Sequence, residues 1–271
     1  MKMTLARYLE RKAAPTSAER QRIPCVACRK PPVSCYCATL RPFDSSPRIV
    51  ILMHPLEAKH PIGTGRMAHL CLSNSKLWVS ADFERHDELG ELLADPKLYP
   101  VLLYPGPKSR NLTTMTERER FELAPPGREL AVIVLDATWH NARKMLLYSP
   151  RLQKLPRVSF TTQQTSRFIV RKQPQAHCLS SLEAVHEILR LLEAKTSKPA
   201  PIRHLLDVFD AMVARQLEHR SRPGPSRHAG GYAARKARRA RALEEKQRSE
   251  APPVGAEILP NLHSKNAQAP D

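Results

Sequence analysis

The sequence predicts an α/β fold built on a mostly parallel sheet with helices on its faces. Short apolar runs, bounded by polar residues and prolines, alternate along the chain with polar stretches that can form helices. This alternation is typical of parallel sheets, whose strands are buried on both faces and joined by helices. Hydrophobic residues make up 41% of the 271 residues, which is enough for one substantial core.

The apolar runs are the expected strands, and stretches with apolar residues three and four apart are the expected helices. The run Arg48-Ile-Val-Ile-Leu-Met53 is the clearest strand. Two late stripes, over residues 182–192 and 205–217, predict helices, and serines that can cap a helix precede the first of them. Further strands are expected over residues 77–80, 100–104, 130–135 and 168–171.

The composition divides the chain into four parts. Residues 1–22 are a basic N-terminal lead-in, and residues 23–42 are a compact knuckle that contains four of the six cysteines. Residues 43–220 carry the strand and helix patterns and form the predicted main domain. Residues 221–271 are rich in basic residues, proline and alanine and lose the apolar pattern, which predicts a largely disordered basic tail.

The chain is strongly basic, with 44 Lys and Arg against 26 Asp and Glu and a net charge of +18. Residues 221–271 hold 10 of these basic residues and 5 of the acidic ones, so 34 against 21 remain for the rest. The predicted folded part is therefore basic in its own right, which favours a polyanionic partner such as nucleic acid. The alternative is a basic surface that serves solubility alone.

Neither a membrane span nor a secretory signal is evident. No apolar run approaches the ~18–20 residues that cross a bilayer, and the opening MKMTLARYLERKAAP has no unbroken apolar segment before a cleavage site. We therefore expect a cytoplasmic protein with no membrane partner. Nothing in the sequence implies an obligate protein partner.

Four cysteines, Cys25, Cys28, Cys35 and Cys37, lie within 13 residues as C-x2-C-x6-C-x-C. Four thiolates can close a tetrahedral shell around one Zn²⁺, and such a closed site is structural. Disulfides would need an oxidising compartment, and the common iron–sulfur spacings differ from this one. The interpretation is a zinc knuckle, with a cluster or incidental thiols as alternatives. Cys71 and Cys178 are expected to be buried.

The apolar run at 130–135 ends in Asp136-Ala-Thr138-Trp139, and a basic helix pattern follows. The carboxyl ends of parallel strands form the usual ligand crevice, so Asp136 and Trp139 are candidates for a functional site. Alternatively, Asp136 or Thr138 caps the following helix. Trp139 can either contact a ligand or order the turn.

Asp136-Ala-Thr138-Trp139, with Asn141-Ala-Arg-Lys-Met145 and Ser149-Pro150 after it, resembles the signature of the DTW-domain family. The resemblance covers about residues 25–192 in the same order. Its other elements are the cysteine knuckle, Met53-His-Pro-Leu-Glu57, Gly63-Thr-Gly65, Leu103-Tyr-Pro105, the stretch with Ser166 and Arg171, and Ser181-Leu-Glu183-Ala184.

The resemblance implies a SPOUT-like α/β fold, knotted near its carboxyl-end loops, that holds S-adenosylmethionine. By analogy, the loops at 103–107, 135–139 and 179–183 come together around this donor. The residues expected to contact the donor are Leu103, Tyr104, Pro105, Leu135, Thr138, Trp139, Leu179, Ser181 and Glu183.

The activity implied is transfer of the 3-amino-3-carboxypropyl group from S-adenosylmethionine to N3 of a uridine in tRNA, which leaves methylthioadenosine. Removal of the N3 proton needs a general base, and Asp136 is the candidate, kept ionised by a cation such as Arg143 or Lys144. His54 and Glu57 can contact the substrate or stabilise a local turn. The candidate substrate-binding residues are His54, Glu57, Arg143, Lys144 and Arg171.

Two other functions remain open at this point. One is a zinc-knuckle RNA-binding protein without catalysis, and the other is a SPOUT-type RNA methyltransferase that uses the same donor. The sequence contains neither a G-x-x-x-x-G-K-[ST] loop nor an H-E-x-x-H pair, and its one G-x-G lacks the third glycine of a dinucleotide-binding motif.

Overall fold

The structure is a computed structural model that describes residues 23–60, 62–171, 178–192 and 200–221. The chain divides into two units, Met1–Ser221 and Arg222–Asp271, and all described residues belong to the first. The lead-in at 1–22 and the tail from residue 222 onward lie outside the described residues, so the expectations for both stay predictions.

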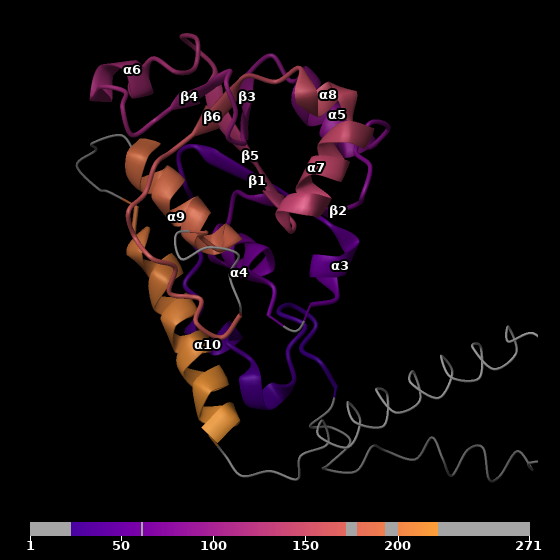
Figure 1. The fold of residues 1–271 in the computed structure, drawn as a ribbon, viewed down its shortest axis with the longest axis vertical. Coiled ribbons are helices and arrows are strands. Elements are labelled where there is room, and N and C mark those ends of the chain that lie inside the picture. The colour runs from indigo at the N-terminus through magenta and orange to yellow at the C-terminus, as the bar shows by residue number, and fades with distance from the viewer. Residues whose placement is uncertain (1–22, 61, 172–177, 193–199, 222–271) are drawn as a thin grey trace, which may run out of the picture. The chain divides into compact units, whose positions relative to one another are not determined.

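Six parallel strands form the sheet, in the order β2-β1-β5-β3-β6-β4 (Figure 1). The strands are β1 (Arg48–Met53), β2 (Lys76–Val79), β3 (Leu98–Leu103), β4 (Ser109–Asn111), β5 (Glu129–Asp136) and β6 (Arg157–Ser159). The neighbouring apolar strands β1 and β5 pair from Arg48 opposite Ala131 to Met53 opposite Asp136. An α/β fold with a parallel sheet is therefore confirmed, whereas the knot stays a prediction.

Helices cover both faces of the sheet. The helices are α3 (Pro55–Ala58), α4 (Thr64–Cys71), α5 (Asp87–Ala94), α6 (Glu117–Phe121), α7 (Trp139–Tyr148), α8 (Pro150–Gln153), α9 (Ser181–Leu192) and α10 (Arg203–Ser221). In Figure 1, α9 and α10 lie side by side on one side of the sheet, and α5, α7 and α8 lie on the other.

The core follows the two-residue period of the strands. Ile49 and Ile51 pack into one hydrophobic cluster with α4, α9 and α10, whereas Val50 and Leu52 pack into the other with α5, α7 and α8. Successive side chains of a strand point to opposite faces, so a strand buried on both sides is apolar throughout. This burial fixes which strand ends meet at the carboxyl edge.

The cysteine knuckle packs against the face that carries α4, α9 and α10. Cys28 and Tyr36 are almost fully buried in that cluster. The knuckle has only two short 3₁₀ turns as regular structure, η1 (Pro32–Ser34) and η2 (Cys37–Thr39). The Arg215 guanidinium on α10 donates a hydrogen bond to the carbonyl oxygen of Cys35, which joins the knuckle to the last helix.

The predicted strand at 168–171 is wrong. Phe168 and Val170 are buried, but Ile169 is 66% exposed and the segment is a turn. Its backbone bonds are local, with the Arg171 amide donating to the carbonyl oxygen of Phe168 at 3.1 Å. The sheet instead contains β4 and β6, which were not predicted. Across the portion of the chain that the structure describes, no helix combines the length and the apolar character needed to cross a membrane.

Candidate functional site

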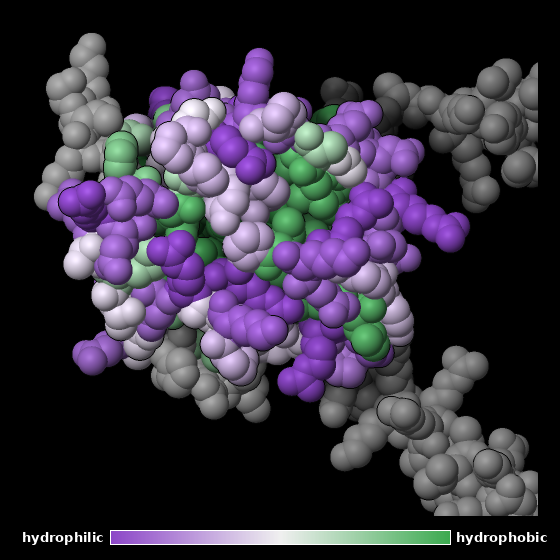
Figure 2. Space-filling model, turned by 90° about the horizontal axis from the view of Figure 1, so that it is seen from above, coloured by the Kyte–Doolittle hydropathy of each residue, from purple (hydrophilic) through white to green (hydrophobic). Residues whose placement is uncertain are grey.

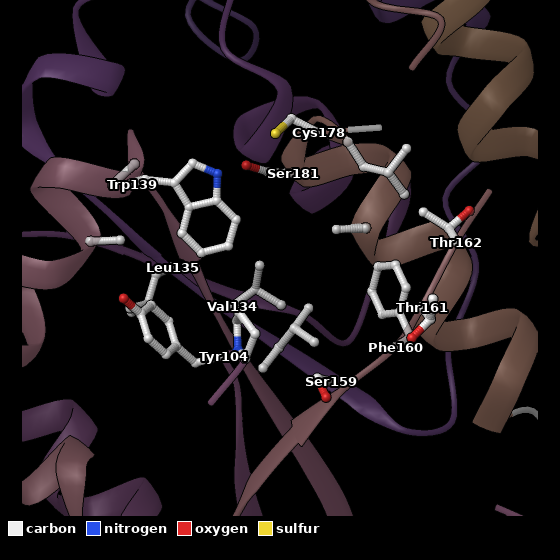
Figure 3. A pocket seen from close by; sticks show the side chains of 16 residues that line it. Tyr104, Val134, Leu135, Trp139, Ser159, Phe160, Thr161, Thr162, Cys178 and Ser181 are labelled. Carbon is white, nitrogen blue, oxygen red and sulfur yellow. The ribbon is translucent and has the colours of Figure 1, made fainter. Parts of the chain in front are cut away.

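A cavity of about 450 Å³ lies at the carboxyl edge of the sheet, bounded by the loops after β3, β5 and β6 and by the start of α9 (Figure 3). Such loops form the ligand crevice of parallel α/β sheets. Below, it is called the first cavity. Its lining residues are Leu103, Tyr104, Pro105, Val134, Leu135, Ala137, Trp139, Ala142, Ser159, Phe160, Thr161, Thr162, Cys178, Leu179, Ser181 and Ala184.

Two aromatic rings form one wall of the first cavity. Trp139 and Tyr104 meet edge to face, with ring centroids 6.0 Å apart, as Figure 3 shows. Trp139 is 54% exposed, so it belongs to the mouth of the cavity and not to the core. The Arg157 guanidinium lies 5.7 Å from the Tyr104 ring centroid and supports that ring from the strand β6.

Asp136 is the last residue of β5 and is buried, at 4% exposed. The Ser181 hydroxyl, which lines the first cavity, donates a 2.5 Å hydrogen bond to Asp136 Oδ1. Asp136 Oδ2 has no hydrogen-bond partner among the described residues. The carboxylate therefore lies directly behind the cavity wall, and Ser181 connects the two.

Asp136 does not cap the following helix. Thr138 is the N-cap of α7, and its hydroxyl accepts a hydrogen bond from the Asn141 amide at 3.3 Å. The alternative raised by the sequence is thus resolved in favour of Thr138 as the cap. The Asp136 side chain therefore has a role other than helix capping.

Gly65 in α4 lies directly against the Asp136 carboxylate. A Cβ atom at position 65 would be 2.4 Å from Asp136 Oδ2 and 2.5 Å from its Cγ. No real Cβ atom tolerates such contacts, so only glycine fits here without displacing the carboxylate.

Burial raises the pKa of Asp136 to about 6. The Ser181 hydrogen bond opposes this rise, Glu57 adds to it, and the cations Arg171 and Arg66 oppose it. Arg143 and Lys144 are exposed on α7. The cations that act on this carboxyl group are therefore Arg171 and Arg66 and not the pair that the sequence suggested.

Glu57 and Arg171 form a bidentate ion pair with two contacts of 2.9 Å. Glu57 is buried, so this pair ties α3 to the segment before residue 172. His54 is the N-cap of α3, and its Nδ1 accepts from the Leu56 amide at 3.2 Å. His54 thus stabilises its own turn.

Glu183 organises the loop in front of α9. Its carboxylate accepts hydrogen bonds from the Ser166 hydroxyl and from the backbone amides of Arg167 and Ser180, at 2.7 to 2.8 Å. Of the nine residues expected to contact the donor, Glu183 and Thr138 do not line the first cavity, whereas the other seven do. Ser159 and Phe160 to Thr162 line it as well, and sequence reasoning missed them because the short strand before them is polar.

A second, smaller cavity of about 90 Å³ lies between the knuckle and the helices α3 and α4. We call it the second cavity. Glu57 is its acidic residue and is already paired with Arg171, so its remaining charges are basic. Its lining residues are Cys28, Arg29, Lys30, Met53, Glu57, Ala58, Lys59, His60, Gly63 and Arg66.

The four knuckle sulfurs have the arrangement of a metal site. All four lie within 4.8 Å of one another, and the pairs Cys25–Cys37 and Cys28–Cys35 are 3.7 and 3.6 Å apart. A tetrahedron with Zn–S bonds of ~2.3 Å has edges of about 3.8 Å, so the sulfur positions fit zinc. Of the two lone cysteines, Cys71 is buried as expected, but Cys178 is only half-buried and lines the first cavity.

A family model described as "DTW domain" matches residues 22–217. The chain belongs to the DTW-domain family. In this DTW-domain chain, the aspartate, threonine and tryptophan of the signature have three different positions. Asp136 is buried behind the cavity wall, Thr138 caps α7, and Trp139 lines the first cavity.

Curated DTW-domain relatives are moderately similar to the chain. A Drosophila melanogaster protein, "tRNA-uridine aminocarboxypropyltransferase 2", is 32% identical over 63% of this chain and 67% of its own length. The Mus musculus protein of the same name is 30% identical over 76% and 67%, respectively. "tRNA-uridine aminocarboxypropyltransferase A" of Arabidopsis thaliana is 28% identical over 74% and 84%. No solved structure matches the chain.

Proposed function

We propose that the chain transfers the 3-amino-3-carboxypropyl group from S-adenosylmethionine to N3 of a uridine in tRNA. The observation that carries the proposal is a cavity at the sheet's carboxyl edge with a buried carboxylate, Asp136, connected to it through Ser181. The relatives named tRNA-uridine aminocarboxypropyltransferase support the reaction and the substrate class.

The first cavity fits a donor of this kind. Its volume of about 450 Å³ is within the ~300–1,000 Å³ of small-molecule sites. Its wall combines the rings of Tyr104 and Trp139 with the strand ends at Leu103 and Leu135, which offer apolar contact and backbone polar groups. These residues, with Pro105, Leu179 and Ser181, are those we propose to hold S-adenosylmethionine.

S-adenosylmethionine, when bound, supplies a carbon made electrophilic by the adjacent sulfonium. The chain must then remove the N3 proton of the uridine. Asp136 is sealed behind Ser181, so we assign the pair a relay: Ser181 Oγ takes the N3 proton while its own proton passes to Asp136 Oδ1. A nitrogen–carbon bond forms, the carbon–sulfur bond breaks, and Asp136 later returns the proton to solvent through Ser181.

The acceptor is a tRNA nucleotide that is not base-paired. N3 lies on the Watson–Crick edge, so the uridine must be unpaired or turned out of its stack to react. The excess of basic residues in the chain suits the surrounding phosphates. On the face shown in Figure 2, hydrophilic residues surround a group of apolar ones. Arg143 and Lys144, which are exposed on α7, are candidates for such contacts.

Zinc in the knuckle is the metal that the sulfur geometry favours. Cys25, Cys28, Cys35 and Cys37 would hold it with four thiolates and leave no open position for a substrate, so its role is structural. Free thiols in this arrangement suit a reducing compartment, and we place the reaction in the cytoplasm.

Nucleoside mass analysis of unmodified tRNA, incubated with the protein and S-adenosylmethionine, tests the proposal. The expected product is a uridine that gains the aminocarboxypropyl group, with methylthioadenosine released. A uridine that gains only a methyl group would show a methyltransferase. A protein whose melting temperature is unchanged by saturating S-adenosylmethionine, and which leaves tRNA unmodified, would be an RNA-binding protein without this activity.

A further inference from the structure

Residues that neighbour Asp136 line the second cavity. Met53, which lines the second cavity, pairs with Asp136 across β1 and β5, and the His54 amide donates to the Asp136 carbonyl oxygen at 3.0 Å. Arg66 lines the second cavity and acts on the Asp136 carboxyl group. The residues next to Asp136 in sequence, Leu135 and Ala137, line the first cavity. Neighbours of Asp136 therefore line both cavities.

The second cavity gathers cations without acidic partners. Arg29, Lys30, Lys59 and Arg66 line it, and in the described part of the chain none of the four forms an ion pair with a carboxylate. Lys30 is only 6% exposed, although ammonium groups are rarely buried without a partner. Arg29 and Arg66 also lie close enough for their charges to repel. The arrangement is costly for the protein alone and favourable once an anion is present.

A zinc-loaded knuckle does not remove this excess of positive charge. One Zn²⁺ with four thiolates carries a net charge of about −2, which offsets Arg29 and Lys30 beside Cys28. Lys59, at the C-terminal end of α3, remains uncompensated, and Arg66, in α4, is partly offset by Asp136 when that carboxyl group is ionised. His60 adds a further hydrogen-bonding ring at the same cavity. The cavity thus stays cationic in the metal-bound protein.

We infer that the second cavity binds a backbone phosphate of the acceptor RNA and so fixes the register in which the RNA presents its uridine to Ser181 at the first cavity. This inference rests on the proposed function for the identity of the polyanion. With about 90 Å³, the cavity accommodates a phosphate group and not a whole nucleotide. Phosphate contacts from Lys and Arg fix the register of a nucleic acid on its protein, which is the task that a reaction at one chosen base requires.

Binding of unmodified tRNA at several salt concentrations, without donor, tests the inference. Lys59→Gln and Arg66→Gln are compared with Lys97→Gln, which removes one exposed positive charge just before β3, at the amino ends of the strands. Each of the first two variants should weaken tRNA binding about tenfold and reduce the slope of log affinity against log salt by about one. Lys97→Gln should leave both values close to those of the unaltered protein.

The affinity for S-adenosylmethionine, measured by calorimetry on the same variants, shows whether the second cavity binds a phosphate of the RNA or the carboxylate group of the donor. It should be unchanged in Lys59→Gln. A loss of donor affinity with tRNA binding intact would assign the cavity to the donor's carboxylate and overturn the inference, as would equal effects of Lys97→Gln and Lys59→Gln on tRNA. Lys59 is exposed, so its replacement tests the site even where Arg66→Gln impairs folding.

These measurements need no turnover. If the protein binds tRNA through the second cavity but transfers nothing, the proposed reaction fails and the phosphate site stands. If transfer occurs and Lys59→Gln binds tRNA normally, the reaction stands and the phosphate site fails.

Discussion

The environment of the Asp136 carboxyl group suits a proton acceptor. It is buried, receives one hydrogen bond from Ser181, and has a second oxygen without a partner among the described residues. A carboxyl group whose pKa is about 6 retains a useful basicity near neutral pH, which a fully solvated aspartate lacks. Burial of Asp136 therefore explains both the raised pKa and the Oδ2 atom without a hydrogen-bond partner among the described residues.

Replacing Asp136 should raise the stability of the protein and abolish its activity. A buried acid with a raised pKa keeps its proton longer in the folded state, so its contribution favours folding at low pH and is lost as the pH rises from 3.8 through about 6. Asp136→Asn keeps Oδ1 as an acceptor for Ser181 and avoids this ionisation. It should raise the free energy of unfolding at pH 8 by up to about 3 kcal/mol, with little change near pH 4, and abolish transfer.

Urea unfolding at pH 4 and pH 8 measures the stability change, and kcat/KM should rise through about pH 6 in the unaltered protein. A variant that gains no more stability at pH 8 than at pH 4 would show that Asp136 ionises as easily as an exposed aspartate. Full transfer activity in the variant would remove Asp136 from the mechanism.

Gly65 tests the packing around the same carboxylate. Gly65→Ala places a methyl group 2.4 Å from the present position of Asp136 Oδ2, so the carboxylate must leave the position in which it accepts the Ser181 hydrogen bond. We expect a loss of about 1–3 kcal/mol in the free energy of unfolding and a large fall in kcat. Gly63→Ala is the matched control, because the nearest atom to its added Cβ is 3.7 Å away. Similar effects of the two substitutions would show that the contact with Asp136 is unimportant.

At the scale of elements, the sequence predicted best where burial dominates. The run Arg48–Met53 coincides with β1, and the run at 130–135 lies inside β5, because both strands are covered on two faces and must be apolar throughout. The three-residue strands β4 and β6 are mostly polar, and their pairing with neighbouring strands, β6 between β3 and β4 and β4 at the edge, defines them. Phe168 and Val170 are apolar because they fill the core from a turn, which periodicity cannot distinguish from a short strand.

The knuckle is the element whose stability depends on a ligand. Cys37→Ser should abolish stoichiometric zinc, lower the melting temperature by roughly 5–10 °C, and weaken tRNA binding, because Arg29 and Lys30 are part of the knuckle. Binding of S-adenosylmethionine should persist, since no knuckle residue lines the first cavity. Metal analysis by plasma mass spectrometry and thermal melting provide the readouts.

Cys178→Ser is the control for that experiment, because Cys178 lies at the first cavity and outside the sulfur cluster. It should keep the full metal content. Normal zinc stoichiometry in Cys37→Ser would exclude Cys37 from the ligand set.

At the scale of the whole molecule, basic charge is spread over both parts of the chain. The tail from residue 222 contributes 10 Lys and Arg against 5 acidic residues, and the remainder contributes more. Removing residues 222–271 should weaken tRNA binding severalfold at low salt and leave kcat unchanged, because the added attraction is non-specific and screened by salt. Filter binding and single-turnover transfer measure the two quantities. Loss of turnover at saturating tRNA would place an essential residue in the tail.

The candidate site was only partly predictable at this scale. The family resemblance predicted that Tyr104, Trp139 and Ser181 come together, whereas the residue pattern alone predicted only that Asp136 and Trp139 lie at the carboxyl edge of the sheet. The closeness of Gly65 and Arg66 to Asp136 depends on how α4 packs against β1 and β5, which no local pattern specifies. For the same reason the second cavity, which the knuckle closes from outside the sheet, was not anticipated.

The separation of the phosphate cavity from the donor cavity has a kinetic consequence. An RNA phosphate bound in the second cavity leaves the first cavity open to the donor, so either reactant can arrive first and either product can depart first. Initial-rate measurements with both concentrations varied should therefore give intersecting lines, and each product should inhibit competitively only against the reactant whose opening it shares. An obligatory sequence of arrival would mean that the two openings communicate through a change of shape that the present arrangement does not contain.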